Sequence, residues 1–142
     1  MLVKEVMTER VEYLPAETSI EDAAKKMASF DCGFLPVAQE DQEKLHGVIT
    51  DRDIAVRAVA RGLDPAATKV EEICSDKVLY CFENDDLAEV AVNMREQQIW
   101  RIIVLDNQEN KELVGVMTVG DILRKGEKQI AAETAQQIMN AA

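Results

Sequence analysis

The sequence contains the same pattern twice, and this internal repeat constrains the fold more than any other feature. Residues 3–11 are echoed by residues 70–78. Each copy ends in glycine, two apolar residues, Thr-x-x-Asp and isoleucine, at residues 47–54 and 115–122. A repeat of this length is one supersecondary unit written twice, and two such units usually bury their apolar faces against each other. We therefore expect any ligand pocket to lie where the two copies meet.

Composition and charge restrict the class of protein and of partner. The chain has 142 residues, of which 47% are hydrophobic, as expected for one globular domain with a real core. Its formal net charge of −11 argues against nucleic acid as a partner, although an anionic small ligand needs only a local positive cluster. No apolar run approaches the roughly 20 residues that span a bilayer, and charged residues interrupt the N-terminal segment. We expect a cytoplasmic protein with no membrane segment.

The residues that most often carry chemistry do not form a recognisable site. Cys32, Cys74 and Cys81 are odd in number and include no C-x-x-C pair, so no disulfide framework is predicted. His46 has no neighbours at metal-ligand spacing, and no Cys/His or Ser/His pair has a third orienting group. The sequence therefore predicts neither a metal site nor an enzyme.

Each copy is predicted to form a short extended segment, a helix, two strands and a second helix. The first extended segment covers residues 11–14, and Thr18 with Glu21 has the spacing of a capping box at the start of a helix. Continuous apolar runs at 34–38 and 45–50, and at 101–105 and 113–118, predict strands covered on both faces. The apolar faces of the first helices are predicted to be Ile20, Ala23, Ala24 and Met27 in one copy, and Leu87, Val90, Ala91 and Met94 in the other.

The remaining segments set the expected boundaries. Polar loops join the paired strands at residues 39–44 and 106–112, and Gly62 is expected to end a helix lined by Ile54, Val56, Ala58 and Val59. Ile130, Thr134 and Ile138 predict a C-terminal helix without a counterpart in the first copy, which caps the domain or packs against a second subunit. We divide the chain into repeat 1 (residues 1–64), repeat 2 (65–125) and a helical extension (126–142).

The Thr-x-x-Asp runs allow two readings. Thr50 with Asp53, and Thr118 with Asp121, have the spacing of a helix N-cap and its third residue, where the carboxylate also favours the positive end of the helix. The same junction of strand and helix is where α/β folds bind phosphorylated ligands, and a short acid there accepts the hydrogen bonds of a ribose diol. One residue can cap and bind, so both readings stay open.

These motifs together resemble a known family. The order of Met7-Thr8, Pro15, residues 33–37 and residues 47–54, repeated down to residues 115–122, is similar to a tandem pair of cystathionine-β-synthase-type (CBS) domains, a Bateman module. The second copy departs from the pattern at Ile103, where the first has Pro36. The resemblance covers nearly the whole chain. It implies an α/β (α+β) fold of two β-α-β-β-α repeats, packed sheet to sheet with pseudo-two-fold symmetry, plus the C-terminal helix.

The resemblance also implies a ligand. Such modules are regulatory and bind AMP, ADP, ATP or S-adenosylmethionine between the repeats, with no obligatory cofactor. The Asp of Thr-x-x-Asp is expected to hold the ribose. One cleft would use Thr50, Asp53 and the phosphate-facing Arg52, with the base near Tyr80, Cys81, Ile99 and Trp100. The other would use Thr118 and Asp121, with the base near Tyr13, Leu14, Cys32 and Gly33. Arg101 occupies a position where nucleotide-binding relatives often place a phosphate-contacting arginine.

The two expected clefts differ in charge, because Arg52 aligns with Gly120 and Arg101 with Phe34. Both arginines could serve one ligand. Trp100 would stack on an adenine or fill the sheet interface. Arg57 and Arg61 are read as solvated helix charges or ion-pair partners.

Two functions of different classes follow from these observations. The first is a sensor of an adenosyl ligand that signals to a partner protein through a conformational or dimer change. The second is a ligand-free structural or dimerisation module, in which the Thr-x-x-Asp runs only cap helices. A homodimer is expected in both cases.

Overall fold

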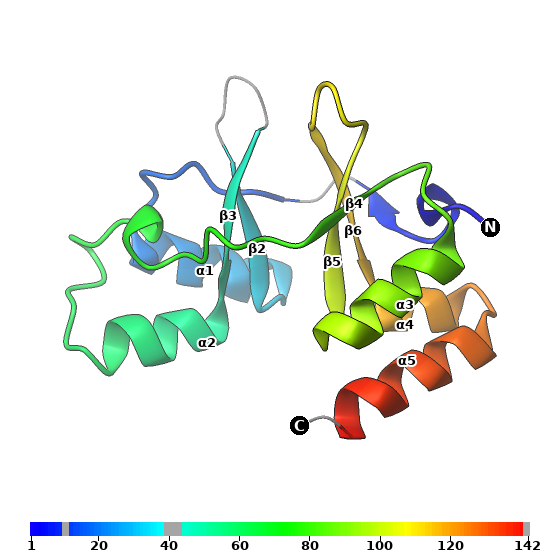
Figure 1. The fold of residues 1–142 in the computed structure, drawn as a ribbon. Coiled ribbons are helices and arrows are strands. Elements are labelled where there is room, and N and C mark those ends of the chain that lie inside the picture. The colour runs from blue at the N-terminus through cyan, green and yellow to red at the C-terminus, as the bar shows by residue number, and fades with distance from the viewer. Residues whose placement is uncertain (10–11, 39–43, 141–142) are drawn as a thin grey trace. The chain divides into compact units, whose positions relative to one another are not determined.

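The chain folds into two compact units (Figure 1). The computed structural model describes residues 1–9, 12–38 and 44–140. Unit 1 combines Met1–Val11 with Leu79–Ala142, and unit 2 consists of Glu12–Val78. Each unit therefore joins the body of one repeat to the segment that opens the other repeat. The repeat boundaries drawn from the sequence divide the chain differently and stay a prediction.

Unit 1 contains a four-stranded sheet in the order β1-β6-β5-β4. β5 pairs antiparallel with β6 and parallel with β4, and β1 from the N-terminal segment pairs antiparallel with β6. From β4 to α4 the chain follows the predicted β-α-β-β-α order (Figure 1). The elements are β1 (Thr8–Glu9), β4 (Tyr80–Phe82), α3 (Leu87–Gln97), β5 (Arg101–Leu105), β6 (Leu113–Thr118), α4 (Val119–Arg124) and α5 (Lys128–Asn140).

Unit 2 repeats this plan with a shorter first strand. β2 and β3 form an antiparallel hairpin, and among the described residues a parallel bridge from Leu14 to Val37 stands where unit 1 has strand β4. That bridge is the counterpart of the parallel pair of Cys81 and Val104 in unit 1. The elements are α1 (Ile20–Phe30), β2 (Phe34–Ala38), β3 (Leu45–Thr50), α2 (Asp51–Asp53) and the π-helical segment η2 (Ile54–Val59).

The opening segment of each repeat has the same local structure. The 3₁₀ turns η1 (Val3–Glu5) and η3 (Val70–Glu72) are each closed by a glutamate. Glu5 accepts the Leu2 N–H at 2.6 Å, and Glu72 accepts the Lys69 N–H at 2.6 Å. Because the first N–H groups of a helix have no partner within it, these carboxylates satisfy a group that would otherwise be unpaired.

A close backbone crossing follows each turn and explains one glycine in each repeat. A Cβ on Gly115 would lie 2.7 Å from the Thr8 carbonyl oxygen, and a Cβ on Gly47 would lie 2.5 Å from the Ser75 carbonyl oxygen. Thr8 is in register with Val116 of β6, and Ser75 bridges Val48 of β3. The glycines thus let the opening segment cross the hairpin at backbone distance.

The four predicted strands are confirmed with their predicted ends, at residues 34–38, 45–50, 101–105 and 113–118. β2 and β5 are buried over four consecutive residues, as predicted for strands covered on both faces, whereas β3 and β6 alternate buried residues with half-buried or exposed ones, so that part of the prediction was wrong. Of the predicted loop 39–44, residues 39–43 lie outside the described residues, as does residue 11 of the predicted extended segment.

The first helix begins one residue later than predicted. Ser19 is the N-cap of α1, since its hydroxyl accepts the Asp22 N–H at 3.1 Å. The backbone of Thr18 instead pairs with a later part of the chain, because its carbonyl oxygen accepts the Val70 N–H at 2.8 Å. This tertiary contact excludes Thr18 from the helix. On the predicted face of α1, Ile20, Ala23 and Met27 are buried and Ala24 is exposed. The predicted face of α3 (Leu87, Val90, Ala91 and Met94) is buried as predicted.

The helix after β3 differs from the predicted amphipathic pattern. The N–H of Ala60 bonds to the carbonyl of Ala55 at 3.0 Å, an i to i−5 bond that widens the helix into η2. In such a helix the spacing of 3.6 residues no longer identifies one face. Ala58 is buried, whereas Val56 and Val59 are 49% and 66% exposed.

The C-terminal helix α5 packs against α3 and α4 of its own unit. Ala131, Thr134 and Ile138 are buried, and the Thr134 hydroxyl donates to the Ile130 carbonyl oxygen at 2.6 Å. Ala131 and Ile138 join the core of unit 1, while unit 2 has a separate core around Ile20, Leu35 and Ile49. No helix of the described ranges is long and apolar enough to cross a membrane.

Candidate functional site

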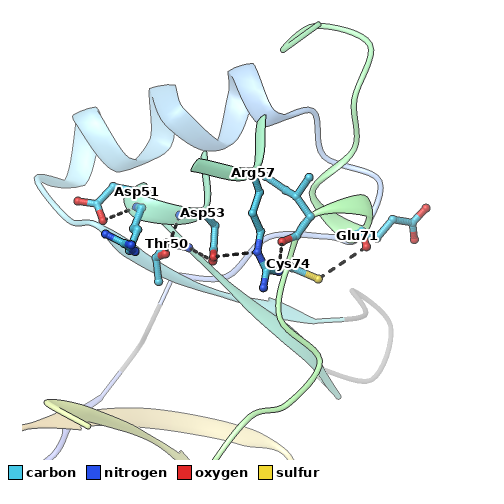
Figure 2. A network of polar contacts seen from close by, with 8 residues as sticks. Thr50, Asp51, Asp53, Arg57, Glu71 and Cys74 are labelled. Carbon is cyan, nitrogen blue, oxygen red and sulfur yellow. Dashed lines mark hydrogen bonds and ion pairs between the residues drawn. The ribbon is translucent and has the colours of Figure 1, made fainter. Parts of the chain in front are cut away.

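Thr50 and Asp53 cap the helix that follows β3 (Figure 2). The Asp53 N–H donates to Thr50 Oγ1 at 3.0 Å, and the Thr50 N–H donates to Asp53 Oδ2 at 2.9 Å. β3 brings Thr50 to the end of the hairpin, and the capping box then fixes the Asp53 carboxylate beside it. The capping reading of this run is therefore correct, and one carboxylate oxygen, Oδ1, is left beyond the cap.

Arg57 lies beside that second oxygen, one turn along the helix. Its Nε is 3.8 Å from Asp53 Oδ1, at the outer limit of an ion pair, while its Nη1 donates to the Ile73 carbonyl oxygen at 3.0 Å. Figure 2 shows the Arg57 side chain extending beside the Asp53 carboxylate. Arg57 was expected to be a solvated helix charge or an ion-pair partner, and the structure shows the ion-pair partner. Because the same guanidinium also donates to a backbone carbonyl, its ion pair with Asp53 is weak.

Cys74 lies at the edge of this network. Its Sγ is 3.9 Å from the Glu71 carbonyl oxygen (Figure 2). Burial raises the pKa of the Cys74 thiol, and the nearby carboxylates of Asp76 and Asp53 raise it further. The group therefore stays a neutral thiol at neutral pH, which suits packing rather than nucleophilic chemistry.

Thr118 and Asp121 repeat the cap in unit 1, in a more closed setting. The Asp121 N–H donates to Thr118 Oγ1 at 3.0 Å, and the Thr118 N–H donates to Asp121 Oδ2 at 2.9 Å. The other oxygen, Oδ1, accepts the Thr8 hydroxyl at 3.3 Å and forms an ion pair with the Arg124 guanidinium. The Asp121 side chain is 6% exposed, against 18% for Asp53. The two carboxylates thus share a cap and differ in their second oxygen.

The arginines expected to face phosphate lie on exposed surfaces. Arg52 is exposed at the start of α2, and its backbone N–H donates to Asp51 Oδ1 at 2.8 Å. Arg101 is exposed at the start of β5, in register with Thr118. Phe34 is in register with Thr50 at the corresponding point of unit 2. Each unit therefore places a different side chain beside its capping threonine.

The residues expected near a base divide into core and surface positions. Cys81 and Leu14 are buried in the cores of units 1 and 2, and burial raises the pKa of the Cys81 thiol to about 12, with Asp85 adding to the effect. Trp100 is 43% exposed, directly before β5, and its carbonyl accepts the Val119 N–H at 3.0 Å. The rest are exposed or half-buried: Tyr13, Cys32 and Gly33 in unit 2, and Tyr80 and Ile99 in unit 1.

Each predicted cleft draws residues from both units, so the two predicted groupings stay predictions. Sequence reasoning did not single out Thr8 or Arg124 as partners of Asp121. The signal for Arg124 was present, because an arginine three residues after an aspartate on a helix lies on the same face. Thr8 had no such signal, since its contact joins residues distant in the sequence. Among the described residues, no three His, Cys, Asp or Glu side chains gather as a metal site would require.

A comparison with known families decides what these repeats are. The model of the CBS domain matches residues 3–59 and again residues 70–128. The chain belongs to the CBS domain family. It holds two CBS domains in tandem, and the regulatory, ligand-binding character of the family fits its architecture.

Similar proteins agree with this assignment. Hypoxic response protein 1 of Mycobacterium tuberculosis is 33% identical over 121 residues, which is 85% of this chain and 82% of the relative. The CBS domain pair of MJ0100, solved in complex with 5′-methylthioadenosine and S-adenosyl-L-methionine, has a TM-score of 0.75 and 29% identity, covering 91% of this chain and 98% of that one. The CBS domain protein PAE2072 from Pyrobaculum aerophilum, complexed with AMP, has a TM-score of 0.78 and 26% identity, covering 96% and 99%.

Proposed function

We propose that this CBS pair is a non-catalytic regulatory module that binds an adenosyl ligand, with Asp53 as the acceptor of the ribose diol. The observation that carries the proposal is the state of the Asp53 carboxylate. Oδ2 is engaged by the Thr50 N–H, while among the described residues Oδ1 has only Arg57, at 3.8 Å. A carboxylate held by its cap, with one oxygen weakly engaged, is a preformed acceptor for a hydroxyl.

The ligand class is inferred from the relatives. The complexes of PAE2072 with AMP and of MJ0100 with S-adenosyl-L-methionine share an adenosine moiety. A site that reads the ribose serves AMP, ADP, ATP and S-adenosylmethionine alike, because these differ only at the 5′ end. Arg52, exposed at the same helix start, is proposed to favour a phosphate there over an uncharged group.

The test is a thermal-shift and calorimetric screen with AMP, ADP, ATP and S-adenosylmethionine. A ligand at about 100 times its dissociation constant adds roughly 2.7 kcal/mol to the free energy of unfolding. Asp53→Asn keeps the shape of the side chain and removes its charge, and we expect it to weaken binding by about tenfold or more. If none of the four compounds stabilises the wild type at millimolar concentration, the proposal fails.

The matched control is Asp22→Asn. Asp22 occupies the third position of α1 as Asp53 does of α2, and its N–H is bonded to the Ser19 hydroxyl. The substitution makes the same change of charge at the same kind of helix start in the same unit. We expect it to leave binding unchanged. An equal loss in both variants would assign the effect to net charge or to capping rather than to the ribose.

A second candidate function, a ligand-free dimerisation module, is favoured by one observation. Val56 and Val59 expose apolar surface on η2, at 49% and 66%, whereas the positions aligned with them in unit 1 hold the charged residues Arg124 and Glu127. We propose a second copy of this chain as the occupant of that surface. Val59→Glu is expected to convert the homodimer to a monomer in light scattering coupled to size-exclusion chromatography, whereas Lys25→Glu, at an exposed position of α1, is expected to leave it intact.

Signalling to a partner protein and a cytoplasmic location belong to the same proposal. Both were expected from the sequence, and both stay predictions. A ligand that changes the dimer in the chromatographic experiment would join the two candidate functions into one mechanism, since binding would then shift the balance between two packings.

A further inference from the structure

The Asp121 carboxylate is satisfied within its own unit on both oxygens. Oδ2 accepts the Thr118 N–H at 2.9 Å, and Oδ1 accepts the Thr8 hydroxyl at 3.3 Å. The Arg124 guanidinium forms an ion pair with the same Oδ1. A ribose hydroxyl approaching Asp121 has to displace one or both of these partners before it can donate to Oδ1.

Asp53 lacks both of these partners. The counterpart of Thr8 is Ser75, which bridges Val48 through its backbone, and in the described part of the chain its hydroxyl has no hydrogen bond to Asp53. The nearby cation is Arg57, four residues on, and its Nη1 is engaged by the Ile73 carbonyl oxygen. The Asp53 side chain is correspondingly three times as exposed as that of Asp121, at 18% against 6%.

The sequence explains why the cations differ. When the two Thr-x-x-Asp runs are aligned, Arg124 stands where the first repeat has Val56, and Lys125 stands where it has Arg57. An arginine three residues after the aspartate reaches the carboxylate directly along one helix face. The difference between the two sites is therefore a difference of one residue in the position of the arginine, together with the Thr8 hydroxyl.

We propose that Arg124 and Thr8 are specificity-determining residues that hold the Asp121 carboxylate closed, so that the chain binds its adenosyl ligand at Asp53 and only weakly at Asp121. This inference rests on the proposed function, because it concerns which of two similar carboxylates receives the ribose. It makes the second CBS repeat mainly structural in the ligand-bound protein.

The barrier is expected to be moderate. The Arg124 side chain is 73% exposed, so water screens its ion pair with Asp121. Removing the guanidinium is therefore expected to tighten binding at Asp121 by about fivefold, and removing the Thr8 hydroxyl by a similar or smaller factor. The two changes together are expected to bring the site into the range of the Asp53 site.

The experiment is calorimetric titration with AMP and, separately, S-adenosylmethionine, which gives both affinity and the number of sites per chain. Arg124→Val installs the residue that the first repeat has at this position, and Arg124→Gln keeps the length of the side chain without its charge. Val56→Arg is the reciprocal change at an exposed position. Thr8→Val keeps the shape of the β1 residue and removes its hydroxyl. Circular dichroism establishes that each variant is folded.

We expect one strong site in the wild type, weakened about tenfold or more in Asp53→Asn, and a second site in Arg124→Val and Arg124→Gln that Asp121→Asn weakens in the same way. Val56→Arg is expected to weaken the first site about fivefold. Two equal sites in the wild type, unchanged by Arg124→Val, would overturn the inference and leave the proposed function standing. A loss of binding in Arg124→Val would also overturn it, since Arg124 would then contact the ligand.

The remaining outcomes separate the two proposals. A wild type that binds neither compound, with an Arg124→Val variant that binds at Asp121, supports the inference and contradicts the assignment of Asp53. No binding in any variant overturns both the inference and the proposed function.

Discussion

The helices that follow the two Thr-x-x-Asp caps differ in packing and in burial. In unit 1, α4 packs against α5, and Ile122 on α4 is fully buried. In unit 2 the corresponding helix runs on as η2, with Val56 and Val59 exposed. The difference shows that duplication preserves the cap while the elements around it diverge. Unit 1 engages both oxygens of its carboxylate and packs α4 against α5, whereas unit 2 leaves one carboxylate oxygen weakly engaged and two valines of η2 exposed.

The largest expected effect comes from truncating the equivalent methionines of the two units. Met94 of α3 is 0% exposed in the core cluster that includes Ala131 and Ile138 of α5, whereas Met27 of α1 is 6% exposed in a smaller cluster. Met94→Ala is expected to lower the free energy of unfolding by about 3–5 kcal/mol, and Met27→Ala by about 2–3 kcal/mol. Urea unfolding measures both. Equal losses would mean that α5 adds little to the core of unit 1.

The next test concerns a feature that the two units share. Gly115→Ala would place a Cβ 2.7 Å from the Thr8 carbonyl oxygen, and Gly47→Ala a Cβ 2.5 Å from the Ser75 carbonyl oxygen. Because the clashing atoms are backbone, each substitution is expected to cost about 1–3 kcal/mol of unfolding free energy in the same urea experiment. A neutral Gly47→Ala would show that the crossing in unit 2 is looser than the crossing in unit 1.

A third test uses the thiols, which differ in depth between the units. Burial raises the pKa of Cys81 to about 12 in the folded protein, from 9.0 in an ordinary thiol. Below pH 9 the thiol is protonated in both states. Above it only the unfolded thiol ionises, so this group lowers the free energy of unfolding by about 1.4 kcal/mol per pH unit as the pH rises towards 12.

Urea unfolding of the wild type and of Cys81→Ala between pH 8 and about 10.5 measures this effect as the difference between two slopes. Cys74→Ala serves as the comparison from unit 2, because the Cys74 thiol is only half-buried while Cys81 is buried. Identical slopes for the wild type and Cys81→Ala would contradict the prediction.

The smallest expected effect is at Gly120, which stands where the first repeat has Arg52. A Cβ there would lie 3.5 Å from Thr118 Oγ1, an ordinary contact, and the residue is inside α4. Gly120→Ala is therefore expected to raise the unfolding free energy by up to about 1 kcal/mol, the difference in helix propensity. A loss of stability would show that the close packing of Arg124 and Thr118 needs the glycine.

The parts of the site that depend on residues close together in the sequence could be predicted. The caps formed by Thr50 with Asp53 and by Thr118 with Asp121 are confirmed, because a capping box depends on residues within one turn. Thr18 as an N-cap was wrong, since its backbone is engaged by Val70, far along the chain. The ring of residues expected around a base is not tested and stays a prediction.

What the sequence by itself determined is the duplicated scaffold. The strands and capping boxes arise from apolar runs and short-range hydrogen bonds, which two copies of one pattern must share. Only the tertiary structure decided the pairing of each opening segment with the other repeat's hairpin, the packing of α5 on α3 and α4, and the contact of Thr8 with Asp121. These contacts join residues distant in the sequence, so their geometry is set by the packed core and leaves no periodic signal in the chain.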